Sequence, residues 1–210
     1  MTSKWIAGAL ALAASMGGVV AGGPASGAET VQAADLETGL VGWWRLDETS
    51  GTVAADSSGN GRDGTVTGAA TWNGGDGFTF SGGSNSSGNA ITLPDNLLSG
   101  LEDVTVDFDV WVDPSLTSGN WFMYNLGNAA TYPDGTGYLF TTNDSSNRLR
   151  STIAEGGYAT EQSASRPGRV PTGQWRHITF SIDGGTPAAP GAARVYEDGV
   201  LVASNTDLTT

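Results

Sequence analysis

The chain has 210 residues, with 22 acidic residues against nine Lys and Arg and a formal net charge of −13. Nucleic acids are excluded as partners, because phosphate contacts need clustered Lys and Arg. The absence of Cys excludes disulfides, thiolate metal sites and cysteine nucleophiles. The 32 Gly residues are about twice the usual share, which indicates many tight turns between short elements.

The first 28 residues have the pattern of an export signal. Lys4 is followed by an apolar run from Trp5 to about Gly22, and small residues lead up to Ala28. We therefore predict a signal peptide over residues 1–28, a linker over 29–38 and one secreted domain over 39–210. An uncleaved membrane anchor is the alternative, but several glycines and a proline weaken this run as a span of about 20 residues. No other segment of the sequence is both long and apolar enough to cross a bilayer.

Short strand-like segments follow in chain order, separated by Gly, Asn, Asp and Ser. They are Leu40–Leu46, Gly64–Thr67, Gly77–Ser81, Ala90–Leu93, Val104–Val112, Trp121–Leu126, Gly137–Thr142, Arg148–Ala154, Trp175–Asp183, Ala193–Tyr196 and Val200–Ala203. Asp95–Leu101 predicts a single helical turn. This spacing of strands predicts an all-β fold, a two-sheet antiparallel jelly-roll sandwich.

Two segments show strict alternation of apolar and polar residues, which is typical of a strand with one buried face. The predicted core residues are Val104, Val106, Phe108, Val110, Val112, Ile178, Phe180 and Ile182. The dipeptide Asp198-Gly199 tolerates the positive φ angles of a tight hairpin turn, so it predicts a hairpin between the last two strands.

Both ends of the chain from residue 39 onward carry motifs of a known family. The C-terminal part reads W-R-H-I-T-F-S-I-D and then V-Y-E-D-G-V-L-V-A, and the N-terminal part reads L-V-G-W-W-R-L-D-E-T-S-G and then D-S-S-G-N-G-R-D-G-T. These motifs resemble the laminin-G-like, concanavalin A-like lectin/glucanase jelly-roll domains. The resemblance implies a secreted, non-catalytic carbohydrate-binding or adhesion module whose partner is a polysaccharide or cell-surface glycan.

The resemblance also implies a last core strand that this chain lacks before Thr210. We therefore expect the protein to continue beyond this residue, into the missing strand and then a glycoside hydrolase or another extracellular domain.

The loop from Asp56 to Asp63 is the candidate metal site. Oxygen-bearing side chains at Asp56, Ser58, Asn60 and Asp63 resemble the alternating ligands that Ca²⁺ accepts. Thr67 stands where an EF-hand needs Glu, so an EF-hand is excluded. Two interpretations stay open: a loop held by hydrogen bonds to backbone amides, or a loop that donates some ligands to a structural Ca²⁺ ion, which the family resemblance favours.

Catalytic residues are harder to find. Glycoside hydrolases need two acids that flank the scissile bond, and the only candidate strand carries Asp107, Asp109 and Asp113 without Glu. His177 is the only His, and alternation predicts a hydrogen-bonded residue on the polar face of its strand. We predict no catalytic residue in this chain; a divergent hydrolase that recruits these Asp residues, or a protein–protein adhesion domain, is the alternative.

The aromatic residues suggest a sugar site. Trp111 shares a strand face with Asp107 and Asp109, and a ring beside carboxylates can stack on a sugar while the acids accept hydroxyl protons. The predicted ligand-binding set is Trp111, Asp107, Asp109, Tyr124 and Tyr138. Of Trp43 and Trp44, one must face inward, and Trp175 is predicted to pack in the core or at an edge.

Overall fold

The computed structural model describes residues 5–13, 39–82, 89–127, 137–185 and 188–209. Its strands are β1 Trp5–Ala13, β2 Leu40–Trp44, β3 Val53–Ala54, β4 Gly64–Thr67, β5 Thr71–Trp72, β6 Phe78–Phe80, β7 Ala90–Thr92, β8 Val104–Val112, β9 Trp121–Gly127, β10 Tyr138–Asn143, β11 Arg148–Ala154, β12 Gln162–Pro167, β13 Trp175–Asp183, β14 Gly191–Glu197 and β15 Val200–Leu208. A short 3-10 segment, Tyr158–Thr160, precedes β12.

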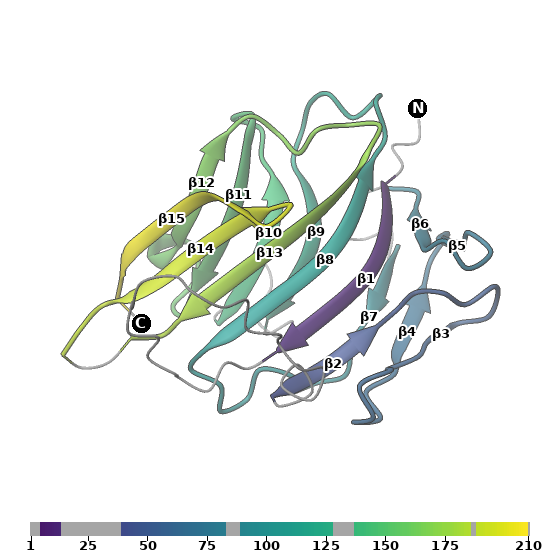
Figure 1. Cartoon of the computed structure of the whole chain (residues 1–210), viewed down its shortest axis with the longest axis horizontal. Helices are drawn as coiled ribbons and strands as arrows, with labels where there is room; N and C mark the ends of the chain where they lie inside the picture. The colour runs from purple at the N-terminus through teal and green to yellow at the C-terminus, as the bar shows by residue number, and fades with distance from the viewer. Residues whose placement is uncertain (1–4, 14–38, 83–88, 128–136, 186–187, 210) are drawn as a thin grey trace, which may run out of the picture.

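The strands form two main layers (Figure 1). The larger sheet has the order β15-β14-β13-β8-β1-β6-β5, with β2 also paired to β1, and the second sheet has the order β12-β11-β10-β9. A small third sheet contains β3, β4 and β7. Because all pairings between these strands are antiparallel, the predicted all-β sandwich is confirmed.

The core lies between the two main sheets. Residues of β8 alternate between buried and half-buried along the whole strand, and all eight predicted core residues of β8 and β13 are buried. Phe108 of β8 meets Tyr124 of β9 edge-to-face, with ring centroids 5.5 Å apart. The alternation of apolar and polar residues therefore correctly predicted which faces of β8 and β13 point into the core.

The predicted hairpin at Asp198-Gly199 is confirmed. Both residues have positive φ angles, 50° and 77°, and they join β14 to β15. This combination matches the right-handed twist of the two strands.

Other local predictions differ from the structure. The segment Asp95–Leu101 forms turns, with Asn96 at a φ of 64°, in place of a helical turn. The strands β1, β3, β5 and β12 were not predicted. In β12 only Ala164 is buried, so the strand has no apolar alternation that a sequence pattern can detect. No helix in the described ranges is long and apolar enough to span a membrane.

The N-terminal apolar segment takes an unexpected place. Trp5–Ala13, which lies within the predicted signal peptide, forms β1 in the larger sheet. The predicted cleavage point after Ala28 and the linker 29–38 lie outside the described residues.

Candidate functional site

The polar face of β8 carries Asp107, Asp109 and Trp111. Their neighbours Phe108 and Val110 are buried, so the period of two turns these three side chains away from the core. The two carboxylates are each about half-exposed, with 35% and 44% of the side-chain surface accessible. Asp113 follows the strand and accepts hydrogen bonds from the N–H and hydroxyl of Ser115, which makes it a turn residue.

Strand β13 places His177 between the two carboxylates. Its Nδ1 lies 2.9 Å from Oδ1 of Asp109 and its Nε2 lies 3.0 Å from Oδ1 of Asp107. Thr179 also donates its hydroxyl to Asp107. The expectation that His177 is a hydrogen-bonded residue of the polar face is confirmed.

This arrangement favours the charged form of the imidazole. Only the doubly protonated ring can donate to a carboxylate from both nitrogens. Partial burial opposes the charge, but the hydrogen bond to Asp109 and the negative charges of Asp107 and Asp109 raise the pKa of His177 above its ordinary value.

The hairpin tip fixes the backbone of this strand. Asp198 accepts a hydrogen bond from the backbone N–H of His177 at 3.0 Å and forms an ion pair with Arg176. The His177 N–H and then the Arg176 guanidinium lower the pKa of Asp198. The position of His177 on β13 is therefore fixed by a second contact, independent of the carboxylates on β8.

Three tryptophans border the acidic centre. Trp175 lies opposite Trp111 where β13 pairs with β8. Trp43 and Asp107 lie on the two sides of β1, each opposite Ala11 in the strand register. Trp44 is buried and Trp43 is 37% exposed, so one of this pair faces inward as predicted. Of the two places predicted for Trp175, the core or an edge, the core is wrong, because Trp175 is 46% exposed where it begins β13.

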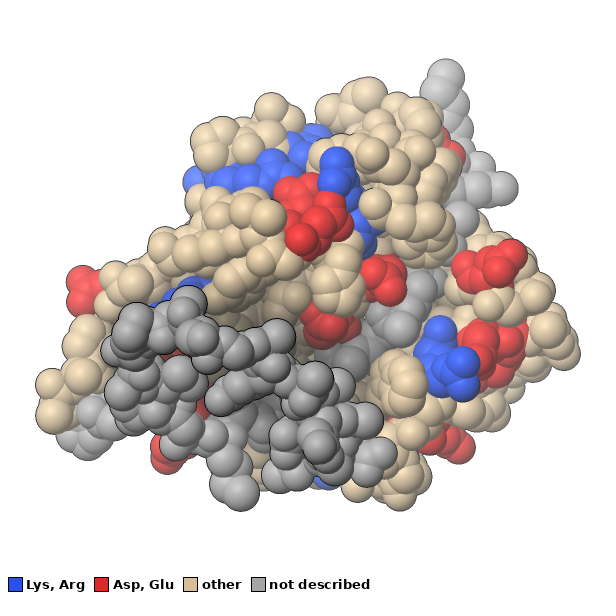
Figure 2. Space-filling view, viewed as in Figure 1, with Lys and Arg blue, Asp and Glu red and all other residues tan. Residues whose placement is uncertain are grey.

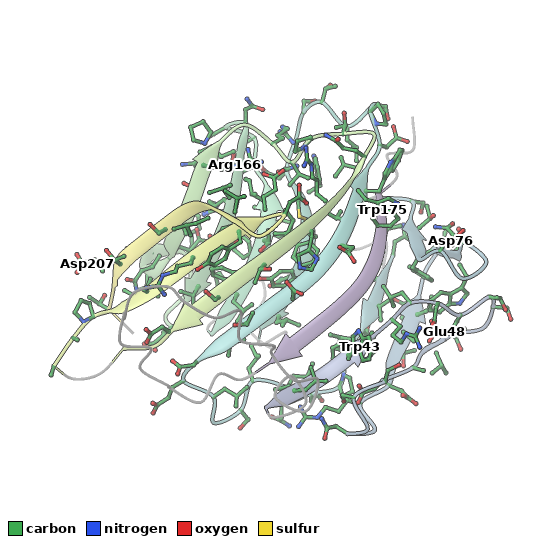
Figure 3. All side chains as sticks on the ribbon, in the orientation of Figure 1. Trp43, Glu48, Asp76, Arg166, Trp175 and Asp207 are labelled. Carbon is green, nitrogen blue, oxygen red and sulfur yellow. The ribbon has the colours of Figure 1, made fainter. Side chains whose placement is uncertain are left out.

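We call the set Asp107, Asp109, Trp111, Trp175 and His177 the acid–aromatic face. Figure 2 shows separate acidic groups on the side of the molecule that β8 and β13 form, with basic groups beside some of them. Figure 3 shows Trp175 toward the start of β1 and Trp43 on β2, at separate ends of this side. The surface can accept hydroxyl protons at its centre and stack flat apolar groups at its margin.

The other two predicted ligand residues lie elsewhere. Tyr124 is between the sheets, where its hydroxyl accepts a hydrogen bond from Thr141 at 3.1 Å and burial raises its pKa. Tyr138 is on β10, and its hydroxyl donates to Glu161 at 2.9 Å. Burial and the neighbouring Glu161 raise the pKa of Tyr138 to about 12. The predicted set thus divides among the acid–aromatic face, the core and the second sheet.

The second sheet has a polar–aromatic surface of its own, which sequence reasoning missed. Arg150 lies 4.9 Å above the ring of Phe140 and forms an ion pair with Glu161. Phe122 meets Phe140 edge-to-face at 5.0 Å and is 47% exposed. Glu161 also lines an open depression of about 570 Å³, whose other lining residues lie between Glu155 and Gln162 and at Thr209. This surface is the competing place for a ligand.

The predicted metal ligands form a hydrogen-bonded loop. Asp56 accepts bonds from the backbone N–H groups of Trp43, Ser58 and Arg62, at 2.9–3.0 Å, and Asp63 accepts one from the N–H of Asp56 at 2.8 Å. Burial opposes ionisation, but these bonds lower the pKa of Asp56 to about 2.

The remaining two predicted ligands are also engaged. Ser58 accepts from the N–H of Asn60 at 3.3 Å, and the Asn60 amide donates to the carbonyls of Leu40 and Val41. Within the described ranges no group of three or more acidic or histidine side chains is arranged to hold a metal ion. The geometry favours the structural interpretation of the loop, and calcium binding stays a prediction.

Sequence reasoning also missed Trp175 and His177 as members of one surface with Trp111. Alternation along each strand shows which side chains share a face, but not which strands are neighbours. The pairing of β8 with β13, 68 residues apart at Asp109 and His177, could be recognised only from the fold.

Comparison with known proteins agrees with this architecture. A model of the concanavalin A-like lectin/glucanases superfamily matches residues 85–210, more than half of the chain, and this match includes β8 and β13. No curated protein sequence matches the chain.

Two solved structures are similar to it. The S-layer domain-containing protein of Clostridium thermocellum ATCC 27405 is 17% identical, with a TM-score of 0.42, over 80% of this chain and 73% of that one. The endo-1,3-beta-glucanase of Streptomyces sioyaensis is 16% identical, with a TM-score of 0.31, over 74% of this chain and 58% of that one. With more than half of its residues matched by the family model, the chain belongs to the concanavalin A-like lectin/glucanases superfamily.

Proposed function

We propose that this protein is a non-catalytic carbohydrate-binding or adhesion module and that the acid–aromatic face is its ligand surface. The observation that carries the proposal is the juxtaposition of Asp107, Asp109 and His177 with two outward tryptophans on adjacent strands. A sugar offers hydroxyl donors to carboxylates and an apolar C–H face to aromatic rings, so both halves of the surface have a role.

The charge state of His177 tunes this surface. While the imidazole is protonated, it donates to both carboxylates and leaves each with spare lone pairs for hydroxyl donors. The three groups are held by protein contacts before a ligand arrives, and a ligand then orders few side chains on binding, which keeps the entropic cost low.

The proposal includes export to the cell exterior, with residues 1–28 as the leader. The pattern of Lys4 and the apolar run that follows it supports this. The proposed partner is a polysaccharide or cell-surface glycan.

Hydrolysis is the alternative, with Asp107 or Asp109 recruited as catalytic acids. Both carboxylates already share one imidazole, whereas a glycosidase needs a free acid on each side of the scissile bond. The assay measures reducing sugar released from a polysaccharide ligand. If the native chain releases sugar and Asp109→Asn does not, the function is catalysis and not binding alone.

The test compares two exposed aromatics on different sheets. Trp175→Ala and Trp111→Ala should weaken binding to a retained polysaccharide by about 1–3 kcal/mol each, by analogy with stacking of other ring ligands. Phe122→Ala is the matched control, because Phe122 is 47% exposed and Trp175 is 46% exposed. Affinity electrophoresis against a polysaccharide panel measures the effect, and melting temperature checks that each variant is folded.

The outcome separates the candidate surfaces. Loss of affinity in Phe122→Ala with no loss in Trp175→Ala would move the site to the second sheet. If the native chain is retained by none of the polysaccharides but captures a cell-surface protein, protein adhesion is favoured instead.

A further inference from the structure

Three polar side chains meet where β9 begins, β10 ends and the connection from β12 to β13 passes. Trp121, the first residue of β9, lies opposite Asn143, the last residue of β10, and side chains of directly opposed residues share one face of a sheet. Arg169 belongs to the connection, and its guanidinium lies 5.7 Å from the centre of the Trp121 ring. Figure 1 shows this connection crossing from the second sheet to the larger one.

We call Trp121, Asn143 and Arg169 the donor cluster, because the atoms that they leave unpaired are all hydrogen-bond donors. Among the described residues, eight buried side-chain nitrogen or oxygen atoms have no hydrogen-bond partner. Four of the eight belong to this cluster: Nε1 of Trp121, Nδ2 of Asn143, and Nε and Nη1 of Arg169. The indole and the guanidinium have no acceptor atom.

The amide of Asn143 can be oriented from its other contact. Asn143 is fully buried, and its Oδ1 accepts a hydrogen bond from the backbone N–H of Val170 at 3.1 Å. Exchange of the two amide atoms would place an N–H group against another N–H group, so Nδ2 is the atom that stays unpaired. The donor cluster therefore presents N–H groups alone.

The charge of Arg169 has no carboxylate partner among the described residues. Its Nη2 donates to the backbone carbonyls of Gly119 and Asp144, each at 2.7 Å. The carboxylate of Asp144 is paired with Arg148 instead, at 2.7 Å. The face of the Trp121 ring attracts a cation, but it supplies no negative charge. A partly buried guanidinium without a counter-charge is costly.

The chemistry of the donor cluster selects its ligand. A buried N–H group without an acceptor destabilises the fold, so the cluster needs a group that accepts several hydrogen bonds. A water molecule brings hydrogens that need acceptors of their own, and it leaves the charge of Arg169 unbalanced. An anion accepts from every N–H and supplies the negative charge. Because all four nitrogens are buried, a carboxylate carried by a sugar or a peptide is too large to reach them.

We propose that the donor cluster is a binding site for a small inorganic anion of the size and charge of chloride. The anion is enclosed between β9, β10 and the β12–β13 connection, and it balances the charge of Arg169. The site is separate from the acid–aromatic face. It holds in place the connection that leads to Trp175, the first residue of β13.

The test measures the melting temperature of the full chain while potassium gluconate is replaced by potassium chloride. The ionic strength is kept at about 0.15 M, so that the screening of other charges does not change. Gluconate is too bulky for the enclosed cluster, whereas chloride binds the folded chain and stabilises it. We expect a rise of about 3 °C or more, as for an anion present at about ten times its Kd.

Variants assign the effect to the donor cluster. Arg169→Gln removes the charge and should reduce the rise to less than about 1 °C. Arg45→Gln is the matched control, because it removes the same charge from an exposed arginine, paired with Asp47 at 3.2 Å, and it should keep the full rise. Trp121→Phe keeps an aromatic ring but loses the Nε1–H group, so about tenfold more chloride should be needed for half of the rise.

Equal rises in the native chain, Arg45→Gln and Arg169→Gln would overturn the proposal, because chloride would then act on the surface in general. No rise at all would also overturn it and would leave the cluster to water. If Arg169→Gln does not fold, crystals of the native chain grown in bromide decide. Anomalous scattering from a bromide among Trp121, Asn143 and Arg169 supports the site, whereas bromide found only elsewhere is an adventitious ion only and contradicts it.

Discussion

The His177 cluster makes a testable prediction about how stability depends on pH. In His177→Gln the imidazole and its two carboxylate contacts, at 2.9 and 3.0 Å, are lost. Exposed ion pairs contribute about 0.2–1 kcal/mol each, and these side chains are 35–44% exposed. The two contacts together should therefore contribute about 1 kcal/mol to the free energy of unfolding, after screening by solvent.

The direction of this pH dependence follows from the direction in which folding shifts the pKa of His177. Because folding raises the pKa of His177, its contribution is fully present below the unfolded value of about 6.5 and is lost as pH rises through the folded pKa. The native chain should melt about 2–4 °C above His177→Gln between pH 5 and 6. This difference should shrink at higher pH.

Calorimetry of both proteins in steps from pH 5 to pH 9 measures the effect. The matched comparison is a double-mutant cycle with Asp109→Asn, which removes the nearer partner and should abolish most of the pH-dependent difference. A difference between native and His177→Gln that grows with pH would refute the reasoning, because it would mean that the folded protein prefers the neutral imidazole.

Other predictions concern the core and the Asp56 loop. Phe180→Ala, at a fully buried position, should cost about 3–5 kcal/mol in urea unfolding, and equal loss in the exposed control Phe122→Ala would contradict the assignment of the core. Asp56→Ala should lower the melting temperature at neutral pH, since its ionised carboxylate accepts three backbone N–H groups. As the pKa of Asp56 is about 2, its contribution is present above the unfolded value of about 3.8 and is lost only as pH falls toward 2. If Ca²⁺ binds this loop, excess Ca²⁺ should raise the melting temperature relative to chelator, and identical values would eliminate the ion.

The position of β1 bears on the leader hypothesis. A segment with the composition of an export signal forms an interior strand, and uncharged apolar residues suit both roles. N-terminal sequencing of the exported protein decides whether cleavage occurs near Ala28. A mature protein that retains Trp5 would contradict the leader and would keep β1 in the larger sheet.

Eleven of the strands, and the inward faces of the two with strict alternation, could be predicted from the sequence alone. In Val104–Val112 and Trp175–Asp183 the period of two is a local property, because successive side chains of any strand point to opposite faces. The tight turn at Asp198-Gly199 is equally local, because few residue pairs accept two positive φ angles. The family motifs also lie in continuous stretches.

Only the tertiary structure decided which strands are neighbours. The contact of His177 with Asp107 and Asp109, the outward position of Trp175 and the packing of Tyr124 against Phe108 all depend on contacts between segments far apart in the chain. The place of β1 is the clearest case: its apolar composition is compatible with a leader, and the hydrogen bonds it makes come from strands that begin 27 or more residues later. The backbone hydrogen bonds between strands are the same whatever the side chains are. The sequence of a single strand therefore does not identify the strand that it pairs with.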